Sequence, residues 1–393
     1  MPDSSFNKLN QPLLREMEYM IYKFSVHPQI YELPDLDSFF TEFGLNEKDL
    51  LFINKFSYND FFKDRKLPCH IFFCEDYTLG EPSDSMVTAL LTDIKGLDID
   101  RIIGIGGGTV MDVAKLLALK DAESADDIFE DKIPLVRDKH LVLVPTTCGT
   151  GCELTAVSVI DRPKYKAKMG KRIECNFADE AVLIPELLSR IPHNIFAFSS
   201  IDALIHAMEI YVTPLSSSFS RVFCLEAVRM IVKGFMDMAE KGMDYKYQIM
   251  DKFLLASSYA GIALSNDPCG AVHASAMHFG GEHHVAHGES NYRFLVPVFT
   301  VYSKLKPEGR VSELACVIRE VMGIDTDLIG TYQALEELLD KITPKKRLRE
   351  YGIAEDSLPY YVDKVFETQQ RILRGNYVQM TKEQYLEIYK LAY

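Results

Sequence analysis

The first half of the chain alternates short apolar runs with helical patterns, and this alternation limits the possible folds more than any other feature. The apolar runs lie at residues 50–54, 70–74, 101–106 and 141–145, each bounded by turn residues or charge. Runs this short and apolar are typical of strands that are buried on both faces. Helical patterns at 83–94 and 110–119 separate them. The sequence therefore predicts an α/β domain with a doubly wound, Rossmann-like parallel sheet.

The second half of the chain has a different character. Two further strand candidates occur at 155–160 and 181–184, and after Pro192 almost every segment has a helical pattern. The predicted helices span 194–213, 218–240, 246–264, 271–285, 289–304, 310–322, 328–341, 355–372 and 382–391. We therefore predict an α/β domain over 1–191, with a partly helical lead (13–24) inside 1–45, and an all-α domain over 192–393.

Composition excludes several partners. The net charge of −14 and the lack of a long basic run argue against nucleic acid. No segment reaches the roughly 18 apolar residues of a membrane helix, and the first residues do not resemble a signal peptide. Eight cysteines without a CxxC pair are typical of reduced thiols. These features predict a cytoplasmic protein that binds neither nucleic acid nor membrane.

Two loops at predicted strand ends have the composition of a phosphate-binding site. Gly106, Gly107, Gly108 and Thr109 join a strand to a helix, and the next strand ends in a second loop that runs from Thr146 to Glu153. Glycine lets the backbone approach a phosphate, and the N–H groups of a helix N-terminus bind anions. The first loop is not the GxGxxG fingerprint. Two such loops in successive units favour a dinucleotide over a single phosphate, and two plain turns remain the alternative.

A predicted helix in the second half carries half of a metal site. Asp202 and His206 are four residues apart, which places a carboxylate and an imidazole on one face. Taken alone, the pair is more typical of a helix surface. Five histidines follow within fifteen residues, at positions 273, 278, 283, 284 and 287. Together these groups could bind a divalent metal, Fe²⁺ or Zn²⁺.

Several motifs together resemble the iron-containing alcohol dehydrogenase family. They are GGGTVMDVAK from Gly106, PTTCGTGCE from Pro145, DALIHAME from Asp202, and the segment from His273 to HGESN at His287. The similarity runs from about residue 45 to the end. Within the family it is nearest to the NAD-dependent 4-hydroxybutyrate dehydrogenase branch, on runs such as LGEPSD from Leu79 and PLVR from Pro134. The resemblance implies the two-domain fold predicted above, with the active site in the cleft between the domains.

The resemblance also implies roles for individual residues. The implied metal ligands are Asp202, His206, His273 and His287. The implied contacts to NAD come from Gly107, Gly108, Thr109, Thr146 and Thr147 at the pyrophosphate and Thr155 near the nicotinamide, and the same loops add Gly106, Asp112 and Thr150. Asn54 stands where many members have a ribose-binding aspartate. Lys168 lies one residue before the position of a ribose-contacting lysine, which Met169 occupies in strict register.

The histidine-rich segment allows two assignments of its metal ligands. His283 and His287 form an i, i+4 pair, which one helical turn could present together. We predict His273 with His287 instead, because the fourteen-residue interval matches the family and Gly280–Gly281 could bend the chain back between them. His278, His283 and His284 remain candidates for proton transfer through water.

The resemblance implies that the reaction is oxidation of 4-hydroxybutyrate to succinate semialdehyde by NAD, in which a bound metal would act as Lewis acid. A dehydrogenase of another short alcohol or diol is the alternative. A metal-dependent lyase of the dehydroquinate synthase type and a non-catalytic nucleotide-binding module are weaker ones. A small-molecule substrate and a homodimer or dimer-based assembly complete the expectation.

Overall fold

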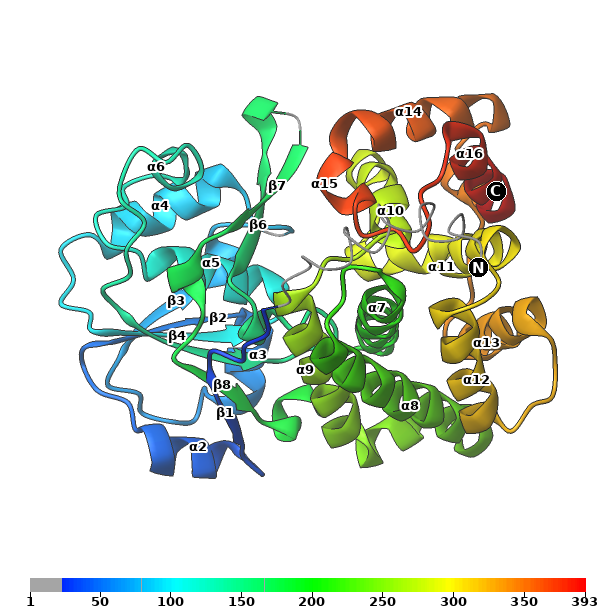
Figure 1. Ribbon diagram of the computed structural model, residues 1–393. Coiled ribbons are helices and arrows are strands. Elements are labelled where there is room, and N and C mark those ends of the chain that lie inside the picture. Colours follow the sequence, from blue (N-terminus) through cyan, green and yellow to red (C-terminus); the bar gives the residue numbers. More distant parts are fainter. Residues whose placement is uncertain (1–22, 79, 166) are drawn as a thin grey trace, which may run out of the picture.

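The computed structural model describes residues 23–78, 80–165 and 167–393 (Figure 1). The helix predicted at 13–24 therefore lies almost entirely outside the described residues.

A six-stranded parallel sheet forms the core of the first half, with strand order β1-β8-β5-β4-β2-β3. Its strands are β1 (Gln29–Glu32), β2 (Asp49–Ile53), β3 (His70–Phe73), β4 (Arg101–Gly106), β5 (His140–Pro145) and β8 (Glu180–Leu183). The intervening helices are α2 (Leu36–Phe43), α3 (Lys55–Phe61), α4 (Asp84–Ile94), α5 (Gly108–Leu117) and α6 (Ala125–Phe129). In β2, Leu51 and Ile53 pack into one core while Leu50 and Phe52 pack into the other. Both faces of the sheet are thus covered, and the predicted fold class is confirmed.

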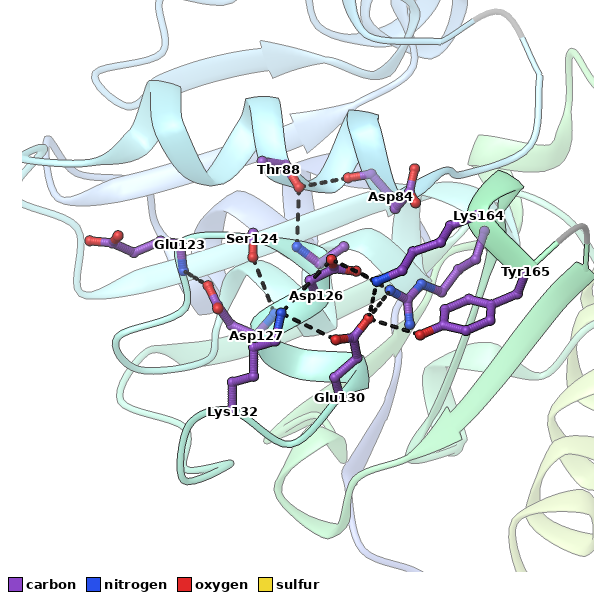
Figure 2. A network of polar contacts seen from close by, with 12 residues as sticks. Asp84, Thr88, Glu123, Ser124, Asp126, Asp127, Glu130, Lys132, Lys164 and Tyr165 are labelled. Carbon is purple, nitrogen blue, oxygen red and sulfur yellow. Dashed lines mark hydrogen bonds and ion pairs between the residues drawn. The ribbon is translucent and has the colours of Figure 1, made fainter.

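The strand predicted at 155–160 lies two residues further on and belongs to a different sheet. It is β6 (Val157–Arg162), which pairs antiparallel with β7 (Ala167–Arg172) in a separate ribbon. A polar network ties the end of β6 and the turn that follows it to α6 (Figure 2). Arg162 forms ion pairs with Asp126 and Glu130, and the Tyr165 hydroxyl donates to Glu130 at 2.9 Å. The ribbon projects from the sheet toward the helical half (Figure 1).

Helices make up the rest of the chain, packed around α7 (Figure 1). They are α7 (His193–Val212), α8 (Ser218–Lys241), α9 (Met250–Asn266), α10 (Ala271–His283), α11 (His287–Leu305), α12 (Arg310–Met322), α13 (Leu328–Ile342), α14 (Leu358–Thr368), α15 (Gln370–Leu373) and α16 (Lys382–Ala392). The single helix predicted at 355–372 is wrong, because the chain there forms two helices, α14 and α15. By length and composition α7 alone among the described helices could span a membrane, but 83% of its apolar window is buried inside the protein.

The predicted bend at Gly280–Gly281 is also wrong. Both glycines lie inside α10, which continues to His283. The reversal comes at His284, whose φ of 52° is left-handed, and α11 then begins at His287. His287 is thus the first residue of a helix, whereas the predicted ranges 271–285 and 289–304 had placed it in the connection between two helices.

Close backbone contacts join the two halves. A Cβ on Gly149, after β5, would lie 2.7 Å from the carbonyl oxygen of Ser199 in α7. A Cβ on Gly151 would lie 2.4 Å from the Cα of Gly261 in α9. The loop after β5 therefore packs directly on the helix that carries Asp202 and His206. Pro192, the predicted domain boundary, is the N-cap of α7, and the division into two domains there stays a prediction.

Candidate metal and nucleotide site

Four side chains from three helices converge beside the loop after β5. Asp202 and His206 come from α7, His273 from the first turn of α10 and His287 from the first residue of α11. One donor atom from each lies within 4.8 Å of the others. The Asp202 carboxylate is 4.0 Å from His206 Nδ1, 4.0 Å from His273 Nε2 and 3.8 Å from His287 Nε2. The geometry thus gathers the four residues that the family resemblance implied.

Two of these histidines are held by their other ring nitrogen. The Gly149 carbonyl accepts a hydrogen bond from His206, and Glu209 Oε2 lies 2.6 Å from His273 Nδ1. His206 Nδ1 and His273 Nε2 are buried and have no hydrogen-bond partner among the described residues. Metal-binding histidines are commonly fixed in this way, because the outer hydrogen bond sets the tautomer and aims the free lone pair.

Asn291, in the second turn of α11, contacts the other two residues of the cluster, Asp202 and His287. Its Nδ2 lies 2.8 Å from Asp202 Oδ1 and 3.1 Å from His287 Nε2. The Asp202 side chain is only 3% exposed, whereas 42% of the His287 side chain is exposed. Burial favours the neutral form of Asp202, but the three histidines and Asn291 outweigh it and hold its pKa below the usual range. Asp202 is therefore ionised at neutral pH.

The cluster fits a divalent transition metal. Three nitrogens and one carboxylate oxygen suit Fe²⁺ or Zn²⁺ and leave coordination positions for a substrate oxygen. Burial lowers the pKa of His206 to about 3, so its imidazole is neutral, as a ligand must be. The two unpartnered ring nitrogens are the donors that a bound cation would satisfy.

The other three histidines of the segment lie elsewhere. His278 Nε2 is 3.3 Å from the hydroxyl of Tyr360, and His283 Nε2 is 2.6 Å from that of Tyr361. His284 occupies the exposed turn after α10. The structure therefore does not bring His283 and His287 together as an i, i+4 pair, since the chain reverses between them. Proton transfer by His278, His283 or His284 stays a prediction.

The predicted nucleotide residues assemble at the carboxyl ends of β2, β4 and β5. A Cβ on Gly106 would lie 2.9 Å from Asn54 Oδ1, one on Gly107 3.4 Å from Thr147 Cγ2, and one on Gly108 3.2 Å from Thr150 Cγ2. Gly107 is the N-cap of α5, so Thr109 lies in the first helical turn. Thr146 is buried, and its hydroxyl lacks a partner among the described residues. The loops after β4 and β5 thus meet at the N-terminus of α5, an arrangement that suits a bound pyrophosphate.

Asp112, Thr155 and Lys168 have protein partners. Asp112 accepts hydrogen bonds from the Cys152 thiol at 2.7 Å and from the Val159 N–H at 2.9 Å. Thr155 Oγ1 is 3.2 Å from the buried ammonium of Lys115. Lys168, on β7, forms an ion pair with Glu81. Asp112 and Thr155 therefore also join the loop after β5 to α5 and β6.

Sequence reasoning missed Glu209, Asn291, Gly149 and Glu75. The first two lie inside motifs that were quoted, and their spacing to a ligand gave a signal, because Glu209 is three residues after His206 and Asn291 four after His287. Glu75 accepts hydrogen bonds from Asn54 Nδ2 at 3.2 Å and from the Lys55 N–H at 2.8 Å. Its contact with Asn54 joins the ends of β2 and β3, and no local sequence pattern predicts such a contact between strands.

Comparisons with known proteins agree with this architecture. Residues 31–185 match the family model of iron-containing alcohol dehydrogenase, and residues 196–393 match the C-terminal model of the Fe-containing alcohol dehydrogenase family. The chain is 39% identical over 366 residues to 4-hydroxybutyrate dehydrogenase of Clostridium kluyveri, covering 93% of this chain and 98% of that one. It is 30% identical over 302 residues to long-chain-alcohol dehydrogenase 1 of Geobacillus thermodenitrificans, covering 75% of each.

Solved structures show the same fold. Sulfoacetaldehyde reductase from Bifidobacterium kashiwanohense, in complex with NAD⁺, superposes with a TM-score of 0.82 at 22% identity, over 95% of this chain and 99% of that one. A 1,3-propanediol oxidoreductase gives 0.81 at 21% identity, over 95% and 100%. The predicted family and enzyme class are confirmed: this chain belongs to the iron-containing alcohol dehydrogenase family, oxidoreductases that act on CH–OH groups.

Proposed function

We propose that the chain is a metal- and NAD-dependent 4-hydroxybutyrate dehydrogenase, which interconverts 4-hydroxybutyrate and NAD⁺ with succinate semialdehyde, NADH and a proton. The observation that carries the proposal is the cluster of Asp202, His206, His273 and His287 beside the glycine-rich loops. The 39% identity to the Clostridium kluyveri enzyme supports the substrate.

The four clustered residues would hold Fe²⁺ or Zn²⁺, which as a Lewis acid stabilises negative charge on the substrate oxygen. Asp202 contributes the negative charge of the cluster, and Asn291 fixes the orientation of its carboxylate. The His206–Gly149 hydrogen bond ties the cluster to the loop of Thr147 and Thr150. The protein would thereby hold the alcohol carbon and the nicotinamide side by side, so that little orientational freedom is lost during hydride transfer.

The contacts of Asn54 support NAD over NADP. Asn54 itself carries no charge, but Glu75 accepts its amide hydrogen bond and places a carboxylate at the same strand ends. The ammonium of the neighbouring Lys55 is paired with Asp76. A 2′-phosphate near Asn54 would therefore meet an uncompensated negative charge.

The residue that binds the substrate carboxylate is the open part of the proposal. Of the cations nearest in sequence, Arg293 is fully buried, and it donates to the backbone carbonyls of Glu289 and Lys346. The other cationic candidates in this segment are His278, His283 and His284, which are partly or fully exposed. We also expect a cytoplasmic protein that forms a homodimer or a dimer-based assembly. All eight cysteines are free, as in a reducing compartment.

The test compares 4-hydroxybutyrate with 1-butanol and 1,3-propanediol by NADH absorbance, using protein loaded anaerobically with Fe²⁺ or Zn²⁺. Butanol keeps the chain length and removes only the carboxylate. We expect kcat/KM for 4-hydroxybutyrate to be at least about tenfold higher, the size of one charge-assisted contact. Equal values would indicate a dehydrogenase of short alcohols or diols. A lyase or a nucleotide-binding module would produce no steady NADH.

A further inference from the structure

Glu209 is a buried carboxylate that joins two of the helices carrying the metal cluster. It lies three residues after His206 and seven after Asp202, so the three side chains share one face of α7. Its side chain is 1% exposed. Oε1 accepts the Val272 N–H at 2.6 Å, and Oε2 lies 2.6 Å from His273 Nδ1. One carboxylate therefore both caps the N-terminus of α10 and contacts its candidate ligand.

These contacts determine which nitrogen of His273 can bind a metal. A carboxylate oxygen accepts, so Nδ1 carries a proton, and the neutral ring, the form that binds a metal, then has its lone pair on Nε2. Nε2 is the atom 4.0 Å from Asp202, and it has no hydrogen-bond partner among the described residues. Glu209 thus aims a free lone pair at the cluster.

Glu209, Cys269 and His273 are themselves close enough to form a second candidate metal group. Their contacts argue against it. Both oxygens of Glu209 already accept hydrogen bonds, and the Nδ1 of His273 that faces them carries the proton. A metal between these three residues would have to displace the Nδ1 proton of His273 and break its hydrogen bond to Glu209.

We propose that Glu209 is a positioning residue, which fixes the Nδ1–H tautomer and the ring orientation of His273 and thereby raises metal affinity. The inference rests on the proposed function, because it assumes that the cluster binds a divalent metal. Outer carboxylates of this kind typically contribute about 10- to 100-fold to metal affinity.

The decisive variant is Glu209→Gln, which keeps the volume and replaces one acceptor by a donor. If the amide NH₂ faces His273, it moves the ring proton to Nε2 and blocks the lone pair. If it faces Val272, two N–H groups oppose each other at the start of α10. Asp267→Asn is the matched control, because Asp267 is also a buried carboxylate and accepts a backbone N–H at the start of another helix, that of Ser217 at 3.1 Å before α8.

The readout is Co²⁺ binding to metal-free protein, measured by competition with a chelator and by the visible absorption of the bound ion. We expect Glu209→Gln to lose about 10- to 100-fold in Co²⁺ affinity with a changed spectrum. Asp267→Asn should keep both, and both variants should bind NADH like the parent. Parental affinity and spectrum in Glu209→Gln would overturn the inference and leave the proposed function standing.

If the parent protein itself takes up no Co²⁺, the proposed function falls, and this inference with it. Should Glu209→Gln not fold, Glu209→Asp replaces it, because aspartate keeps both acceptor oxygens at shorter reach. Its Co²⁺ affinity should be lower than that of the parent, and an unchanged value would contradict the assignment.

Discussion

The nucleotide loops and the metal cluster are built in opposite ways. The loops are contiguous stretches of small residues, where the lack of a side chain at Gly106 and Gly108 brings backbone, Asn54 and Thr150 together. The metal cluster consists of side chains from α7, α10 and α11, up to 85 residues apart, and each is aimed by a second residue or a helix start. Adding a side chain to such a loop should weaken nucleotide binding, whereas removing a side chain from the cluster should weaken metal binding. The two sites should therefore fail separately.

The largest expected effect comes from removing a ligand. His273→Ala and His287→Ala should lose most bound metal and, with it, at least about a thousandfold in turnover, since a Lewis acid contributes several kcal/mol to such a reaction. His278→Ala and His283→Ala are the controls and should keep near-stoichiometric metal. Metal analysis with NADH titration checks this. Full occupancy in His273→Ala, or loss in His283→Ala, would refute the ligand set.

A reciprocal pair of glycine substitutions tests whether the sites separate. A Cβ on Gly106 would lie 2.5 Å from the Val110 Cβ, and one on Gly288 only 2.3 Å from the Phe198 carbonyl oxygen, beside Asp202. We expect Gly106→Ala to lose about 10- to 100-fold in NADH affinity and to keep its metal, and Gly288→Ala to do the reverse.

Gly281→Ala is the control for this pair, because it lies in the same histidine-rich segment and its Cβ would meet nothing within 4 Å. If either variant lost both its metal and its affinity for NADH, the two sites would form one cooperative unit.

Acid should weaken the metal-free cluster. Burial lowers the pKa of His206 to about 3, whereas the unfolded chain titrates near 6.5. Between these values the unfolded state binds the extra proton, so the free energy of unfolding falls as the pH drops. Between pH 6.5 and pH 5, protonation of His206 in the unfolded chain should lower the free energy of unfolding by about 2 kcal/mol.

Urea unfolding of metal-free protein at the two pH values measures this loss of stability. His206→Asn should remove most of the loss that His206 causes, because asparagine does not titrate. An equal pH dependence in parent and variant would show that His206 is accessible to protons in the folded state.

The smallest effect concerns the choice of nucleotide. Glu75→Gln removes the carboxylate beside Asn54 while keeping a hydrogen-bonding side chain there. The ratio of NADPH to NADH affinity should rise by roughly tenfold, about 1.4 kcal/mol. Fluorescence titration needs no bound metal, so the outcome is independent of the cluster. An unchanged ratio would place the adenosine ribose away from Glu75.

The central strands were predictable from sequence because each is apolar on both faces and ends at a glycine, proline or polar residue. Strand β1 and ribbon strand β7 were missed, because QIYE lies at a sheet edge and AKMGKR has three charged residues and no apolar alternation. Their pairing depends on distant partners, not on a local pattern.

The sequence pattern alone predicted only two of the four candidate metal ligands. Asp202 and His206 share a helix, so their spacing placed them. The choice of His273 with His287 came from family resemblance, and the expected bend at Gly280–Gly281 lies instead at His284. Glu209 went unassigned because its partner His273 is 64 residues away in another helix. The ligand set and the nucleotide contacts stay predictions until they are tested.

The most direct test of the central claim is an anomalous difference map collected at the iron edge on crystals of iron-loaded protein. The account predicts a single strong peak enclosed by Asp202, His206, His273 and His287. A peak beside Glu209 and Cys269, or one at His283 or His284, would contradict it.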